Sequence, residues 1–147
     1  VLTAGAARLG LADSVRFTGA VALEEVPRFL MQMDAAAAPY PPLANFYFSP
    51  LKVYEYLAAG LPVVASRVGQ LAELLTDGVD GLLYPPGDAR ALAGALTRLA
   101  GDAALRERLG RAGRAKVEAK HSWQHVARRI LTIAEGARVP ERVQVRG

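Results

Sequence analysis

The segment SPLKVYEYLAAGLPVVAS, residues 49–66, holds one acid and one base in an otherwise largely apolar run. The acid is Glu55, and the base is Lys52, three residues earlier. A carboxylate buried among apolar side chains is costly unless something pairs with it or binds to it. Residues three apart share a helix face, so an ion pair between these two side chains is one explanation. A carboxylate can also accept hydrogen bonds from two vicinal hydroxyl groups, such as those of a ribose.

The signals around Glu55 predict a helix with an anion-binding end. Ser49 suits an N-cap, Pro50 suits the first helical position, and Gly60 suits the helix end. The N-terminus of such a helix has free main-chain N–H groups and about half a unit of positive charge, which together favour a phosphate. A phosphate at this end and a ribose further along the same helix would form a nucleotide site.

Strand and helix patterns alternate along the rest of the chain. The predicted strands cover residues 15–19, 34–40, 62–66 and 81–86. The predicted helices cover residues 23–32, 49–60, 69–78, 89–100, 103–120 and 122–134, and Asp88 is placed to cap the fourth of them. This alternation predicts an α/β fold, a Rossmann-like parallel sheet with helices on both faces. Ligands of such sheets bind beyond the carboxyl ends of the strands, which favours the loop at residues 39–49.

Length and composition set further bounds. A chain of 147 residues fits one domain, which we expect over residues 1–135, with a polar tail over residues 136–147. The absence of cysteine excludes disulfides, thiolate catalysis and cysteine-ligated zinc within this sequence. No apolar run reaches the 18 or so residues of a membrane span, and no signal-peptide pattern opens the sequence. We therefore expect a cytoplasmic protein.

The net charge of +4 arises largely from arginines late in the sequence. They gather at residues 106–116 and at Arg128 and Arg129. Glu107 and Glu118 lie among these bases, and no aromatic side chains interleave with them. This pattern favours a solvated helix face over a nucleic-acid surface, so we expect no nucleic-acid partner.

Several motifs together resemble glycosyltransferase family 4. They are EYLAAGLPVVAS at residues 55–66, GQLAELLTDGVDGLLYPPGD at residues 69–88, DSVRFTG at residues 13–19, DAAAAPY at residues 34–40 and KHSW at residues 120–123. Members of this family are retaining GT-B enzymes, in which two Rossmann-like domains enclose the active site. The resemblance covers the chain to about Glu135 and implies a C-terminal, donor-binding domain that lacks its first strands. It also implies an acceptor-binding domain upstream.

The resemblance assigns roles to the residues around the helix at residues 49–60. The family pattern of Glu, seven residues and Glu places its second Glu on Glu55, where it would hold the ribose hydroxyls. Its first Glu, which contacts the donor sugar, falls on Tyr47 in this sequence. Tyr47 and Phe48 are therefore candidates for the donor-sugar pocket, with Ser49 as another polar contact. Packing within the loop is the alternative role of the two aromatic residues.

The same resemblance implies where the rest of a nucleotide would lie. The main-chain N–H groups of Leu51 and Lys52, with Ser49, would meet the diphosphate. The Lys52 side chain either adds a positive charge there or remains solvated. The rim around the nucleobase would be formed by Gly19, Ala20 and Val21.

The implied reaction is transfer of a sugar from a nucleoside diphosphate sugar, with UDP or GDP as leaving group, to an unknown acceptor with retention of configuration. A helix N-terminus and cations can stabilise the leaving phosphate, so neither a metal ion nor a cofactor is expected. No residue of this chain is assigned as the nucleophile or the base. Two alternatives remain open: a nucleotide-binding or interaction module without catalysis, and a GT-B sugar-nucleotide epimerase.

Further expectations concern the assembly and activity of this chain, its two histidines and the full-length enzyme. A sheet that lacks its first strands has an unpaired edge, so this chain alone could pair with a second copy as a homodimer. Without an acceptor domain it should transfer no sugar. His121 and His125 lack the H-E-x-x-H pattern of a zinc site, so interface packing is favoured for both. The full-length enzyme could also associate with a membrane.

Overall fold

The computed structural model describes residues 2–42 and 49–136. The chain forms two compact units, Val1–Gln32 and Met33–Gly147. Within the described ranges, no helix combines the length and the apolar character that crossing a membrane requires.

The first unit contains short helices and no strand among its described residues. Its elements are α1 (Leu2–Arg8), the 3-10 turns η1 (Ala12–Ser14) and η2 (Leu23–Glu25), and α2 (Val26–Leu30). The strand predicted at residues 15–19 is therefore wrong. Val15 does have extended backbone, with φ −121° and ψ 120°, but the segment pairs with no other strand. The strand pattern of the sequence agrees with the extended backbone of Val15, but a local pattern cannot supply a pairing partner.

The second unit is built on a parallel three-stranded sheet. Its strands are β1 (Ala36–Ala38), β2 (Val63–Ser66) and β3 (Leu82–Tyr84), in the order β1-β2-β3. The register pairs Ala38 with Ala65, and Ser66 with Tyr84. The carboxyl ends of all three strands therefore meet at one edge of the sheet. The α/β fold with a parallel sheet is confirmed.

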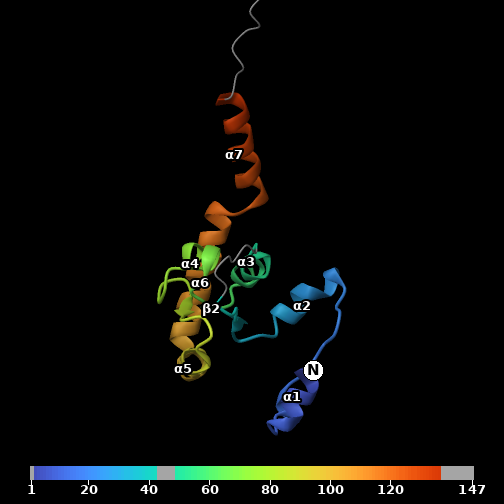
Figure 1. The fold of residues 1–147 in the computed structure, drawn as a ribbon. Helices are drawn as coiled ribbons and strands as arrows, with labels where there is room; N and C mark the ends of the chain where they lie inside the picture. The colour runs from blue at the N-terminus through green and yellow to red at the C-terminus, as the bar shows by residue number, and fades with distance from the viewer. Residues whose placement is uncertain (1, 43–48, 137–147) are drawn as a thin grey trace, which may run out of the picture. The chain divides into compact units, whose positions relative to one another are not determined.

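Helices cover both faces of this sheet (Figure 1). One core cluster joins α3 (Leu51–Ala58) and α4 (Gly69–Leu74) to β2 through residues that include Leu57, Leu71 and Val63. The other joins α5 (Ala89–Gly101) to β3 through Leu99 and Tyr84. Helix α6 (Ala103–Lys120) contributes to both clusters. Strands β2 and β3 each contribute to both clusters because successive side chains of a strand point to opposite faces of the sheet.

Helix α6 also fixes its neighbours through polar contacts. The Arg106 guanidinium donates hydrogen bonds to the carbonyls of Leu99 and Ala100 in the last turn of α5, at 2.6 and 3.1 Å. The exposed pair Arg114 and Glu118 is joined at 2.8 Å. Of the bases in the predicted solvated face, Arg106 thus caps α5, and Arg114 pairs with an acid within α6 itself.

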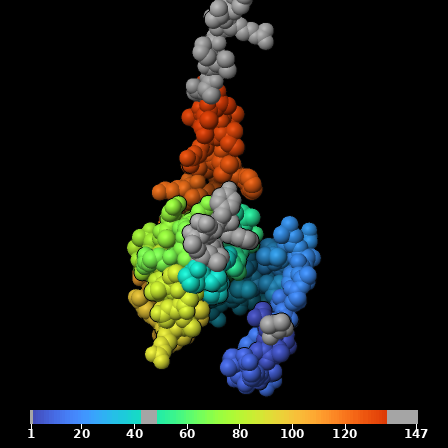
Figure 2. Space-filling model, viewed as in Figure 1, coloured from blue at the N-terminus to red at the C-terminus, as the bar shows by residue number. Residues whose placement is uncertain are grey.

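The last helix, α7 (Trp123–Gly136), has an exposed apolar side. Trp123 is 87% exposed, and Ile130, Leu131 and Ile133 are each at least 60% exposed. Figure 2 shows the orange-red surface of this helix open to solvent on the side in view.

Candidate functional site

Helix α3 begins one residue later than predicted. Its N-cap is Pro50, with φ −80° and ψ 42°, and no side chain caps the first N–H groups. The predictions of Ser49 as N-cap and Pro50 as first helical residue are therefore wrong by one position. Ser49 is exposed just before the helix. The N–H groups of Leu51 and Lys52 lie in the first turn, where helix geometry provides no internal acceptor, so this end can accept an anion.

The Lys52 side chain is held close to this end of α3. Its Nζ lies 4.6 Å from the centroid of the Tyr40 ring, a cation–π contact. Tyr40 follows β1, and so the contact joins the carboxyl edge of the sheet to the first turn of α3. A cation at a helix N-terminus opposes the helix dipole unless an anion is present. The arrangement therefore favours a negatively charged ligand.

Glu55 lies one turn further along α3 and is exposed. Its charge therefore carries no burial cost, although it lies in an apolar run of the sequence. Among the ion pairs of the described residues none includes Glu55 or Lys52, and Lys52 contacts Tyr40 instead. The carboxylate is thus available to hydroxyl donors from solvent or from a ligand.

A buried hydroxyl network that the sequence analysis missed lies at the carboxyl edge of the sheet. Ser66 Oγ accepts a hydrogen bond from the Tyr40 N–H at 2.7 Å and donates to the Tyr40 carbonyl at 2.9 Å. It also lies 3.0 Å from Tyr84 Oη. These contacts join the ends of all three strands. The signal in the sequence was that Ser66 ends one predicted strand and Tyr84 lies in the last half of another.

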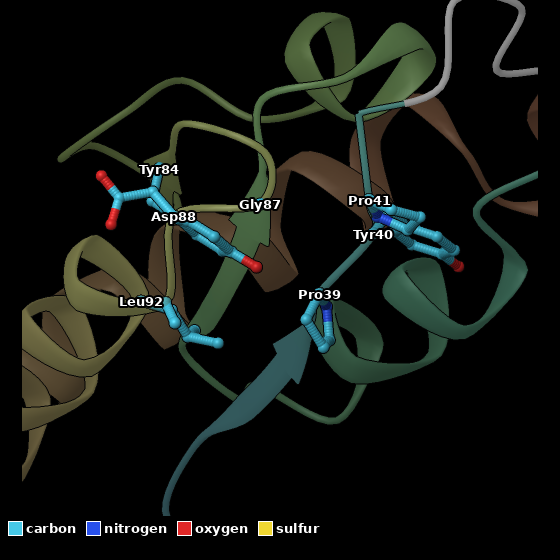
Figure 3. Close-up of a pocket in the computed structure, with 8 residues that line it drawn as sticks. Pro39, Tyr40, Pro41, Tyr84, Gly87, Asp88 and Leu92 are labelled. Atoms are coloured by element: carbon cyan, nitrogen blue, oxygen red, sulfur yellow. The ribbon is translucent and has the colours of Figure 1, made fainter.

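A pocket of about 200 Å³ lies next to this network. Its lining includes Pro39, Tyr84, Asp88 and Leu92 (Figure 3). Asp88 accepts a hydrogen bond from the Ala91 N–H at 2.9 Å, which confirms its predicted cap of α5. In Figure 3 the Tyr84 hydroxyl points toward the β1 side of the pocket.

A second missed contact braces the loop after β2. Arg67 forms an ion pair with Asp77 at 2.8 Å, and both side chains are about half exposed. The other oxygen of Asp77 accepts a hydrogen bond from the Leu83 N–H at 2.9 Å. The pair thus ties the exit of β2 to β3.

The remaining predicted site residues are the three at the nucleobase rim and the two aromatic residues of the donor-sugar pocket. Gly19, Ala20 and Val21 belong to the first unit, where Gly19 has φ 68° and is exposed. Tyr47 and Phe48 lie outside the described residues. Their roles at the nucleobase and the donor sugar stay predictions.

His121 contacts an aromatic ring of α3. Its ring centroid lies 5.0 Å from that of Tyr54. Partial burial lowers the pKa of His121 below its usual value, and the charges of Lys116, His125 and Lys120 lower it further. Within the described ranges, no group of three or more acidic, histidine or cysteine side chains could hold a metal ion.

Comparisons with known proteins match both the sequence and the fold. The sequence profile described as glycosyl transferases group 1 matches residues 2–102. The amylovoran biosynthesis glycosyltransferase AmsK of Erwinia amylovora is 38% identical over 123 residues, which are 82% of this chain and 30% of that protein.

Two solved structures resemble the fold closely. Sucrose-phosphate synthase from Thermosynechococcus elongatus has a TM-score of 0.80 and 31% identity over 92% of this chain and 33% of that one. HepE from Anabaena, solved in complex with UDP, has a TM-score of 0.79 and 26% identity over 92% of this chain and 36% of that one. The chain therefore spans about a third of these proteins. Its matched profile and its relatives show that it belongs to the group 1 glycosyltransferases.

Proposed function

We propose that this chain is the donor-binding domain of a retaining family 4 glycosyltransferase. It binds a nucleoside diphosphate sugar, with the diphosphate at the first turn of α3 and the ribose at Glu55. The observation that carries the proposal is the arrangement of α3. Its N-terminus has no side-chain cap, Lys52 lies in its first turn, and the Glu55 carboxylate is exposed one turn further along. The complexes of HepE with UDP and with UDP-glucose support a nucleotide-sugar donor.

The chemistry of this site follows from charge. As the sugar passes to the acceptor, the bond between its anomeric carbon and the diphosphate oxygen of the donor breaks, and negative charge develops on the leaving nucleoside diphosphate. The free N–H groups of Leu51 and Lys52 and the Lys52 ammonium stabilise that charge. This arrangement needs no metal ion, and we place the enzyme in the cytoplasm. The residues that bind the acceptor come from the rest of the enzyme, and any nucleophile or base comes from there or from the substrate itself.

We expect Glu55→Gln to weaken nucleotide binding about ten-fold or more. The amide keeps the shape of the side chain but replaces one acceptor oxygen by a donor, and a hydrogen bond to a charged group contributes about 1.5–3 kcal/mol. Calorimetric titration of UDP and GDP into the full-length protein measures the change. The melting temperature should hardly change, because Glu55 is exposed.

Two controls make this test specific. Glu118→Gln makes the same substitution at an exposed glutamate of α6 and should leave the affinity unchanged. With 2′-deoxy-UDP as the ligand, the loss caused by Glu55→Gln should be smaller, because one of the two hydroxyl partners is missing. If wild type and Glu55→Gln bind UDP with equal affinity, and likewise GDP, the ribose assignment is contradicted.

A further inference from the structure

We propose that Ser66 is a positioning residue, whose buried hydroxyl fixes Tyr40 so that the Tyr40 ring holds Lys52 at the diphosphate end of α3. Ser66 is fully buried, whereas Lys52 is only half-buried. The inference rests on the proposed function, because it gives Lys52 a diphosphate to contact.

The hydrogen bonds of Ser66 use its whole capacity. A hydroxyl offers one donor and two acceptor positions. Ser66 Oγ meets the Tyr40 N–H at 2.7 Å, the Tyr40 carbonyl at 2.9 Å and Tyr84 Oη at 3.0 Å. With both main-chain groups of Tyr40 bonded to a single atom, the backbone of that residue has little freedom to rotate.

The sheet register places the Ser66 hydroxyl next to the residues that follow β1. Ser66 pairs with Tyr84 across β2 and β3, and Ala65 pairs with Ala38 across β2 and β1. The end of β2 therefore lies between the last residue of β3 and the residues that follow β1. From this position the short Ser66 side chain reaches both the Tyr40 backbone and the Tyr84 hydroxyl.

The direction of the Tyr40 side chain completes the link. Figure 3 shows its ring turned away from Tyr84 and Leu92, on the opposite side of the β1 exit. There the ring packs partly against the core cluster that includes Val53 and Leu57 of α3, and Lys52 Nζ lies 4.6 Å from its centroid. Fixing the Tyr40 backbone therefore fixes the surface on which the lysine rests. A long, flexible lysine held in one place loses less freedom when it binds a phosphate.

The test compares ligands with and without the diphosphate. In the full-length protein, we expect Ser66→Ala to weaken binding of UDP, or of GDP if that is the nucleotide the wild type binds, about five-fold to ten-fold. Affinity for the matching nucleoside, uridine or guanosine, should remain within two-fold, because the nucleoside has no phosphate for Lys52 to contact. Ser122→Ala, the same change at the start of α7, should alter neither affinity.

Non-additivity provides the second readout. If Ser66 acts through Lys52, then Ser66→Ala combined with Lys52→Met should weaken UDP binding no more than Lys52→Met alone. Additive losses, equal losses for UDP and uridine, or no loss would each overturn the proposal.

A variant that keeps the hydrogen bonds covers the case in which Ser66→Ala does not fold. Tyr40→Leu retains both main-chain groups but removes the ring, so it should reproduce the selective loss of UDP affinity. Unchanged UDP affinity in Tyr40→Leu would overturn the proposal by itself. Glu55→Gln should weaken uridine as well as UDP, so a failed ribose site and a failed positioning role give different patterns. A wild type that binds neither nucleoside diphosphate would reject the proposed function and this inference with it.

Discussion

Gly110→Ala should destabilise the second unit by about 3 kcal/mol, at the upper end of the usual cost of overpacking. A Cβ atom at this position would lie 2.1 Å from the Gly60 carbonyl oxygen and 3.1 Å from its carbon. Those atoms are main chain, so no side-chain rotation relieves the overlap. Helix α6 must instead move away from the turn that follows α3.

The turn itself cannot easily give way. Gly60 has φ 75°, its N–H bonds to the Leu57 carbonyl at 2.9 Å, and the Leu61 N–H bonds to the Tyr56 carbonyl at 3.0 Å. Displacing α6 would also open its packing against the fully buried Leu57. Since α3 carries Lys52 and Glu55, loss of this packing should also loosen the candidate site.

Urea unfolding of wild type and variant measures the effect. Gly94→Ala is the matched control, since a Cβ atom there meets nothing within 4 Å. Because alanine favours a helix interior over glycine, that control should gain about 0.8 kcal/mol. A Gly110→Ala midpoint close to that of wild type would show that α6 and the turn can separate at little cost.

Local signals in the sequence predicted the framework of the site well. The strand predicted at residues 62–66 forms β2, and Asp88 caps α5 as expected. Both depend on residues that are neighbours in the chain: a run of β-branched residues for the strand, and a carboxylate three residues before the N–H that it caps. Such features can be predicted from the sequence because the interacting residues are already close together along the chain.

Features that depend on distant partners could not be predicted. The segment at residues 15–19 has a strand pattern but no strand beside it. Glu55 follows apolar residues, yet whether it is buried depends on which side of α3 the other elements cover, and α6 packs against the side with Leu57. The role of Ser66 can be predicted only when the register of the three strands is known. The requirement for glycine at position 110 can be predicted only when the path of the turn at Gly60 is known.

The site residues divide in the same way. Glu55 and Lys52 were found because a charge in an apolar run is conspicuous in any sequence. Tyr40, Ser66 and Tyr84 look like ordinary core residues, and only their mutual distances reveal a network. Groups that would touch a ligand were therefore easier to find than groups that hold them in place.

Lys116→Met should cost about 3 kcal/mol or more, because it leaves a buried carboxylate without its counter-charge. Lys116 forms an ion pair with Asp80, whose side chain is only 6% exposed, and its Nζ donates to the Leu74 carbonyl at 2.7 Å. In the variant, Asp80 keeps one hydrogen bond, from the Thr76 N–H at 2.7 Å. The Leu74 carbonyl also loses its ammonium donor.

A double substitution distinguishes two causes of the destabilisation: the loss of the Lys116–Asp80 ion pair and the burial of an unpaired Asp80 carboxylate. If the cost arises mainly from the unpaired carboxylate, then Lys116→Met combined with Asp80→Asn should be more stable than Lys116→Met alone. The amide is neutral and can still accept the Thr76 hydrogen bond. Lys120→Met, at an exposed position in the last turn of the same helix, should change the free energy of unfolding by no more than about 0.5 kcal/mol. Urea unfolding measures the stability of the three variants. If the double variant is no more stable than Lys116→Met, then Lys116 acts through its packing and its hydrogen bond to the Leu74 carbonyl. In that case the ion pair with Asp80 contributes little to holding α6 against the loop after α4.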